Sequence, residues 1–279
     1  MMRDCFASLA TTGLVLAVAA CSSAPTKLAE QQSTAKEALA REVREELQIG
    51  REMSAKILGY YGVEKKNPAK TQYVQLVGNS LAAIYGRPEL NYRFAILNSP
   101  TVNAYAVPGG YIFVTQGLLK KLQNESELAA VLAHEIVHVN QRHMYQQIRP
   151  KRDVSASESM VRMMSRGASD IGNNLFLIVQ HGMKLLLEEG LGKEKELEAD
   201  SMGVVLTAAA GYDPNAYSRF LERCEKEESN LKVEGASVGF KERLAMVRKT
   251  VAENGLTAQS STINTTLAAR FTAAIGRTP

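Results

Sequence analysis

The sequence is poor in cysteine and histidine, the residues that most often form disulfide frameworks or bind metals. It has three cysteines and four histidines among 279 residues. Cys5 and Cys21 lie close to the N-terminus, which leaves Cys224 without a partner further along the chain. A disulfide-stabilised fold is therefore excluded, and we expect Cys224 to be a buried thiol.

Long apolar runs and basic runs are also absent. No stretch after residue 20 contains as many as about 18 consecutive apolar residues, so we predict no transmembrane helix. Lysine and arginine total 33 and aspartate and glutamate 29, for a net charge of +4. The two signs are mixed, and no aromatic residues alternate with basic ones, which argues against nucleic acid as a partner. The chain is long enough for one domain with a complete hydrophobic core.

Residues 1–20 have the features of a signal peptide. The apolar run Phe6–Ala20 is about fifteen residues long, too short for a membrane-spanning helix and typical of a secretory signal. The VAAC sequence that ends at Cys21 resembles the lipobox of bacterial lipoproteins, whose cysteine is acylated after cleavage. That resemblance implies a lipid-bearing Cys21, and the two serines after it favour anchoring at the outer membrane. An ordinary signal peptide cleaved nearby is the alternative.

Apolar periodicity and turn signals predict a mainly helical α+β fold with a small antiparallel sheet. Residues 21–36 are small and polar and are expected to form a tether. Residues 92–100 alternate like a strand, and residues 102–117 read as a hairpin around a Pro-Gly-Gly turn. The tail, residues 256–279, is expected to be loosely ordered. Helices are expected at about 37–57, 72–85, 124–147, 153–190, 193–210, 215–228 and 241–253.

Three of the four histidines lie in the stretch VLAHEIVHVNQRH, which ends at His143. His134 and His138 are four residues apart, so on a helix they lie about 40° apart on one face and can share one zinc ion. Glu135 can reach a water on that metal, which lowers the pKa of the water towards ~7, and can act as general base. The alternative is a pair of surface histidines, but a capped, strongly periodic helix favours the HExxH interpretation.

A catalytic zinc ion also needs a third protein ligand. His143 is nine residues after His134 and points about 180° away on a regular helix, so we expect it to pack or hydrogen-bond behind the site. His181 is isolated, and an isolated histidine is more often structural. In KEKELEADSMG, Glu196 and Asp200 share a helix face, so one could bind the metal while the other holds a histidine N–H. Acids at a helix start also arise simply because they complement its dipole.

Three blocks, HEIVH, ELEAD and NAYAVPGGYIFVTQGLL, occur in an order that resembles the zinc endopeptidases of the HtpX and CAAX prenyl protease kind. The resemblance implies a zincin-like domain, here residues 37–255, with one zinc ion per subunit. It implies His134, His138 and Glu196 as the zinc ligands and Glu135 as the catalytic base. Asp200 would be the supporting acid.

The resemblance also implies a substrate-binding strand edge before the Pro-Gly turn, formed by Asn103, Ala104, Tyr105 and Ala106. An ordinary hairpin is the alternative. Many soluble members of the family carry a Thr-His-Pro stretch before a later arginine. The matching region here, SVGFKERLAMVRK, has no histidine, so a regulatory ligand from that loop is missing. Arg243 matches the arginine and is a candidate for contact with substrate.

The expected function follows from these points. Known members of the family often span the membrane several times, whereas this sequence resembles the soluble periplasmic lipoprotein branch. We expect an outer-membrane-anchored, periplasm-facing zinc endopeptidase that cleaves unfolded or misassembled outer-membrane proteins. Two alternatives stay open: a chaperone-like assembly factor with a latent or structural metal site, and a lipoprotein scaffold without metal.

Overall fold

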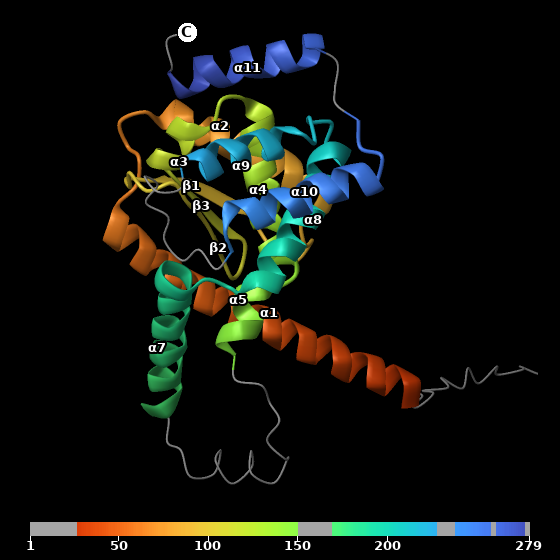
Figure 1. The fold of residues 1–279 in the computed structure, drawn as a ribbon. Helices are drawn as coiled ribbons and strands as arrows, with labels where there is room; N and C mark the ends of the chain where they lie inside the picture. The colour runs from red at the N-terminus through yellow and green to blue at the C-terminus, as the bar shows by residue number, and fades with distance from the viewer. Residues whose placement is uncertain (1–26, 150–168, 228–237, 258–260, 277–279) are drawn as a thin grey trace, which may run out of the picture. The chain divides into compact units, whose positions relative to one another are not determined.

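The computed structural model describes residues 27–149, 169–227, 238–257 and 261–276. Contacts divide the chain into residues 1–40 and residues 41–279. The second unit contains the sheet and nearly all the helices (Figure 1). The helices are α1 (Lys27–Tyr61), α2 (Pro68–Tyr85), α3 (Gln116–Lys121), α4 (Glu125–Asn140), α5 (His143–Ile148), α7 (Ser169–Lys184), the π-helix η1 (Leu185–Glu189), α8 (Lys193–Ala209), α9 (Ala216–Lys226), α10 (Phe240–Glu253) and α11 (Ser261–Ile275).

The mostly helical α+β fold is confirmed, but the segments near the two ends of the chain differ from the expectation. Helix α1 begins at Lys27, inside the predicted tether, because the Leu, Ala, Glu and Gln residues there all favour helix. The tail contains α11 rather than loose chain. Phe271 of α11 is fully buried, with its ring 6.3 Å from that of Tyr73 on α2. This apolar contact orders a segment whose Thr- and Ala-rich composition gave a weak signal.

The sheet is mixed, which corrects the expected antiparallel arrangement. Its strands β1 (Arg93–Leu97), β2 (Ala104–Val107) and β3 (Tyr111–Thr115) lie in the order β1-β3-β2. The β2–β3 hairpin is antiparallel, and Gly109 and Gly110 in its turn have φ values of 80° and 88°. Strand β1 pairs in parallel with β3, which lies between the other two. A hairpin signal in the sequence does not show which of its strands the preceding strand will join.

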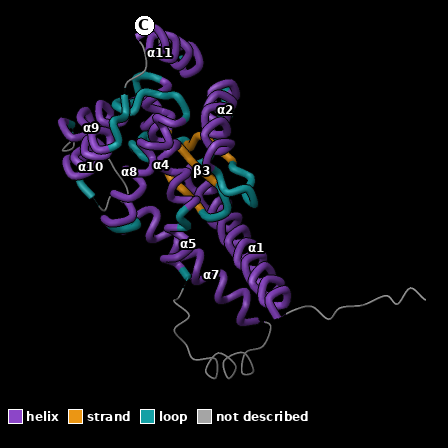
Figure 2. Tube along the Cα trace, turned by 90° about the vertical axis from the view of Figure 1, so that its right-hand side faces the viewer, coloured by secondary structure: helices purple, strands orange, loops and turns teal. Residues whose placement is uncertain are grey.

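Helices cover both faces of the sheet, and in Figure 2 strand β3 lies among them. Alternate strand residues such as Ile96, Ala106 and Val114 join a core formed with α2, α4 and the C-terminal helices. Their neighbours, including Tyr105, join a second core formed with α1, α5, α7 and η1. A strand places successive side chains on opposite faces, so this arrangement fixes the register of the sheet.

Outside the sheet, the structure tests the prediction for Cys224. Cys224 is 3% exposed, so the buried thiol is confirmed. Within the described residues, no helix is both long enough and apolar enough to cross a lipid bilayer. The signal segment and Cys21 lie outside the described residues.

Candidate metal centre

Helix α4 carries the two histidines of the HExxH motif and is buried along nearly its whole length. Its start is capped as predicted, because the Asn124 side chain accepts a hydrogen bond of 3.0 Å from the backbone N–H of Glu127. His134 and His138 are each 4% exposed and Glu135 is 8% exposed. A helix held on all sides fixes the directions in which these side chains project.

Helix α8 supplies the carboxylates and lies directly against α4. The close approach depends on Gly203: a Cβ atom there would lie 3.1 Å from the backbone N and Cα of His134. The helices therefore nearly touch at the first histidine of the motif. This contact brings the first turns of α8, with Glu196 and Asp200, to the histidines of α4.

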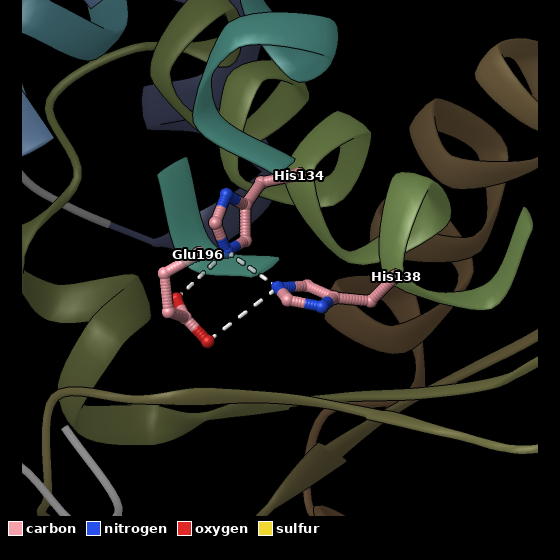
Figure 3. Close-up of side chains that lie close together, drawn as sticks. All are labelled: His134, His138 and Glu196. Carbon is pink, nitrogen blue, oxygen red and sulfur yellow. Dashed lines mark hydrogen bonds and ion pairs between the residues drawn. The ribbon is translucent and has the colours of Figure 1, made fainter. Parts of the chain in front are cut away.

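The structure brings His134, His138 and Glu196 together, as Figure 3 shows. The two histidine Nε2 atoms are 3.0 Å apart. The Glu196 carboxylate oxygens lie 3.5 Å from Nε2 of His134 and 3.7 Å from Nε2 of His138. Among the described residues, this is the group of three whose donor atoms are close enough to hold one metal ion.

These distances fit a tetrahedral zinc ion. Zinc–nitrogen and zinc–oxygen bonds of about 2.0–2.1 Å place neighbouring tetrahedral ligand atoms about 3.3 Å apart. The observed separations of 3.0, 3.5 and 3.7 Å lie around that value. Two imidazoles and one carboxylate are also the donor set of catalytic zinc sites that keep a fourth position open. The residues present therefore fit the ion that the motif implies.

Asp200 supports His134 from behind and is fully buried. Its Oδ1 atom lies 2.9 Å from Nδ1 of His134, which leaves the Nε2 of that ring to face Glu196. Arg243 of α10 donates two hydrogen bonds to the same carboxylate, from Nη2 at 2.7 Å and from Nε at 3.0 Å. Tyr217 of α9 donates to Asp200 Oδ1 at 3.2 Å and accepts from Arg243 at 2.6 Å. Arg243, the predicted substrate contact, thus holds Asp200 as well as bordering the site.

His143 lies behind His138, as predicted, but by an unexpected route. Helix α4 ends at Asn140 instead of continuing to about residue 147, and α5 begins at His143. The Nδ1 atoms of His143 and His138 are 2.9 Å apart. His181 is exposed on α7 and is not in the three-residue group.

Burial and neighbouring charges shift the pKa values of the site residues in different directions. Burial lowers the pKa of His138 to about 3, so this ring is neutral, the form that binds metals. Burial and Arg243 both oppose charge on His134, but hydrogen bonds to Asp200 and Glu196 raise its pKa to about 9. Burial raises the pKa of the Glu135 carboxyl to about 7. For Asp200, burial opposes ionisation, yet Arg243 and His134 lower the pKa to about 2.

Comparison with known protein families gives a match to this chain. The family described as Peptidase family M48 matches residues 68–265, which include α4, α8 and all three strands. The chain belongs to peptidase family M48. The zinc-peptidase resemblance seen in the motifs is confirmed at the level of this family.

Several curated relatives resemble this M48 chain. The mitochondrial metalloendopeptidase OMA1 of Schizosaccharomyces pombe is 32% identical over 162 residues, which cover 58% of this chain and 46% of the relative. The β-barrel assembly-enhancing protease of Yersinia pestis is 32% identical and covers 56% and 33% of the two chains. The protein of the same name from Escherichia coli is 31% identical and covers 63% and 38%. The matched region thus spans less than half the length of these relatives.

The site of this M48 chain opens into a pocket between α4, β2 and η1. Residues 102–106 and Leu185 and Leu186 of η1 line it, as do Arg243, Glu135 and Tyr217. β2 is an edge strand of the sheet. The Asn103 carbonyl accepts from the N–H of Thr115, so the backbone groups of Ala104 and Ala106 point to the outer side of β2. The predicted strand edge therefore runs along the pocket.

Sequence reasoning missed two features of the site. Tyr217 ends the segment AGYDPNAY, and nothing in the sequence pattern gave it a partner. The π-helix η1 places Leu185 and Leu186 at the pocket, and its apolar residues read only as part of a helix. Both are positioned by tertiary packing that the local sequence does not encode.

Proposed function

We propose that the chain is a zinc-dependent endopeptidase, with zinc held by His134, His138 and Glu196 and with Glu135 as the catalytic base. One observation carries the proposal: two imidazole nitrogens from α4 and a carboxylate from α8 converge at zinc-binding distances. Membership of a peptidase family supports it. So do the names of the relatives, which include metalloendopeptidase and protease.

A zinc ion bound by these ligands would lower the pKa of a water molecule to about 7 and polarise the scissile carbonyl. Glu135 follows His134 directly and lines the same pocket, so its carboxylate is placed to take a proton from the attacking water. The same group then passes this proton to the leaving amine nitrogen. Asp200 orients His134 by accepting its Nδ1–H, and Arg243 keeps Asp200 ionised.

The pocket supports an unfolded polypeptide as substrate. The Ala104 carbonyl and the backbone groups of Ala106 on the outer side of β2 can pair with an extended peptide, a mode of binding that depends little on sequence. The Ala104 N–H already donates to Oδ1 of Asn103 at 2.9 Å. Apolar residues line the pocket beside the reacting groups, among them Val131, Phe220 and Phe240. Apolar side chains are exposed in misfolded chains, and relatives are named for β-barrel assembly. We therefore propose misassembled outer-membrane proteins as substrates.

The proposed location is the periplasmic face of the outer membrane, with the mature protein anchored through a lipid on Cys21. The proposal includes membership of the soluble lipoprotein branch of the HtpX-like and CAAX protease-like enzymes. The support is the VAAC segment before Cys21. A Cys21→Ser variant should lose incorporation of labelled fatty acid and leave the membrane fraction. Unchanged labelling of that variant would remove the anchor from the proposal.

The enzymatic proposal is tested with purified protein and casein as an unfolded substrate. Cleavage should stop on addition of a chelator and return with zinc. Replacing Glu135 by Gln should reduce turnover by about 10²–10⁴-fold while one zinc ion per chain stays bound. A Glu194→Gln variant is the control, because Glu194 is exposed on the same helix as Glu196.

The same assay separates the peptidase from a chaperone-like assembly factor with a latent or structural metal site. Such a factor would bind zinc and suppress aggregation of casein without cleaving it. Normal turnover by the Glu135→Gln variant would contradict the mechanism. In cells, comparing outer-membrane proteins in strains that carry wild type and Glu135→Gln should identify substrates that accumulate only with the variant.

A further inference from the structure

The chain makes an abrupt turn directly after the second histidine of the motif. Arg142 has a φ of 56° and is the single non-glycine residue with positive φ among the residues that the structure describes. This left-handed conformation is unfavourable for a residue with a side chain, so surrounding contacts must hold it. The turn ends α4 and starts α5 at His143.

Acidic residues of α1 hold Arg142 in this conformation. Its Nε donates to Oε2 of Glu46 at 3.1 Å, and its Nη1 donates to Oε2 of Glu42 at 3.1 Å. Glu46 is 1% exposed and also accepts from Nη1 of Arg87 at 2.8 Å and from the N–H of Gly109 at 3.3 Å. One buried carboxylate thus joins α1, the end of α2, the β2–β3 turn and the α4–α5 turn.

The turn changes where His143 points. On a regular helix, a residue five positions after His138 would lie about 140° away around the axis. Because of the turn at Arg142, the ring instead meets His138, with ring centroids 4.9 Å apart and planes at 77°. Lys195 of α8 fixes α5 from the other side, by donating to the His143 carbonyl at 3.3 Å and to the Gln147 side chain at 3.0 Å.

The hydrogen bonds of the two rings are consistent with one arrangement of protons. If Nε2 of His138 faces the metal, its Nδ1 carries the proton and donates to Nδ1 of His143, 2.9 Å away. His143 then carries its own proton on Nε2, which lies 3.3 Å from Oε2 of Glu198 on α8. This tautomer assignment is inferred from partners. It leaves the Nε2 lone pair of His138 directed at the metal position.

We propose that His143 is a positioning residue for the metal centre: the left-handed turn at Arg142, held by Glu46, returns the His143 ring to His138 and fixes His138 with its Nε2 towards Glu196. The inference rests on the proposed function for the metal itself. It adds that the orientation of the second histidine is built by the turn after the helix. Asp200 performs the equivalent task for His134.

The test uses the full chain with three substitutions of His143 and measures zinc affinity by competition with a chelator at fixed pH. Asparagine places an amide where Nδ1 of the ring lies, whereas glutamine places it where Nε2 lies. His143→Ala and His143→Gln should weaken zinc binding by about 10- to 100-fold. His143→Asn should restore most of the loss, because its Oδ1 can still accept from His138.

A second readout is the visible spectrum of the cobalt-loaded protein, which reports ligand geometry independently of activity. The spectrum of the His143→Asn variant should match wild type, and that of the His143→Gln variant should be altered. A packing defect alone would affect both polar variants alike, so equal zinc affinities for Asn and Gln would overturn the proposal. If wild type itself binds no zinc, the proposed function fails first. If wild type binds zinc and all three variants match it, only the role of His143 is removed.

Discussion

The two ends of helix α4 each carry a buried polar cluster, and the clusters differ in how their hydrogen-bonding capacity is used. At the start of the helix, the Glu125 carboxylate is fully buried. It accepts from the hydroxyl of Tyr73 at 2.6 Å, from that of Tyr212 at 2.9 Å and from the guanidinium of Arg270. Each of its oxygens thus has two donors from the protein, and α11 is tied to α4 through Arg270.

Towards the other end of the same helix, the arrangement is reversed. The Nδ1 atoms of His134 and His138 contact Asp200 and His143. Their Nε2 atoms and the oxygens of Glu196 face one another across a few ångströms. In the neutral tautomers that bind a metal these atoms are all acceptors, an arrangement that is unfavourable unless a cation lies between them; without a metal, the hydrogen bonds to Asp200 and Glu196 hold a proton on His134 instead. The comparison shows two uses of buried polar groups. A group such as Glu125, whose hydrogen-bonding capacity is filled by protein donors, stabilises the fold. Acceptor atoms that converge on one point, as in His134, His138 and Glu196, form a binding site for a cation.

The largest effect is expected at the metal end, from Asp200→Ala. The substitution removes the closest carboxylate partner of the Arg243 guanidinium, which keeps only the more distant Glu196 at 4.0 Å, and it removes the acceptor that orients His134. Breaking a buried ion pair costs about 3–5 kcal/mol, and losing the partner of a metal-binding histidine weakens metal binding about 10–100-fold. Urea unfolding and chelator competition measure the two effects. Wild-type values in both would mean that Asp200 does not support the site.

A substitution in the Glu125 cluster, at the start of α4, should lower stability without changing zinc affinity. Glu125→Gln replaces an acceptor of the Arg270 and tyrosine donors, and it should lower the free energy of unfolding by about 1–3 kcal/mol. Zinc affinity should stay within roughly twofold of wild type, because packing separates the two clusters. Urea unfolding with a parallel zinc titration tests this. A tenfold loss of zinc affinity would break the distinction between the clusters.

Gly203→Ala tests the close approach of α8 to α4. A new Cβ atom 3.1 Å from the backbone of His134 must push the helices apart by a few tenths of an ångström. We expect a stability loss of about 1 kcal/mol but a larger fall in kcat/KM, on the order of tenfold, since catalysis is sensitive to small displacements. Gly59→Ala is the control, because a Cβ there meets nothing within 4 Å. Equal kcat/KM in the two variants would contradict the account.

The smallest effect is a pH dependence of the Glu125 cluster. Burial, and then the charge and hydrogen bond of Glu125, raise the pKa of Tyr212 from 10.0 to about 12. The folded protein therefore keeps a proton that the unfolded chain releases, so this stability is fully present below pH 10 and is lost as the pH rises from 10 to 12. A Tyr212→Phe variant should show a shallower alkaline decline in the free energy of unfolding. An identical decline would assign the effect to other groups.

Much of the metal centre could be predicted from the sequence because it depends on helical periodicity. Spacings of four residues place His134 beside His138 and Glu196 beside Asp200, whatever the rest of the fold does. The residue types then restrict the chemistry to a metal site. The HExxH and ELEAD blocks therefore indicated two histidines and a pair of acids, and the family resemblance selected Glu196 from that pair as the metal ligand.

The parts that could not be predicted depend on contacts between distant segments. The turn at Arg142 is held by Glu46, nearly a hundred residues away in the sequence, so local signals indicated an uninterrupted helix. Strand β1 joins β3 in parallel because of packing on both faces of the sheet, which a hairpin signal does not encode. The order of α11 comes from Phe271 and from the buried carboxylate of Glu125.

The most direct test of the central claim is the amount of zinc bound per chain after dialysis against a weak chelator. Wild type should retain one zinc ion, and so should Glu194→Ala, which changes an exposed acid in the same first turn of α8. Glu196→Ala should retain only a small fraction. Equal zinc content in Glu196→Ala and wild type would contradict a centre built from His134, His138 and Glu196.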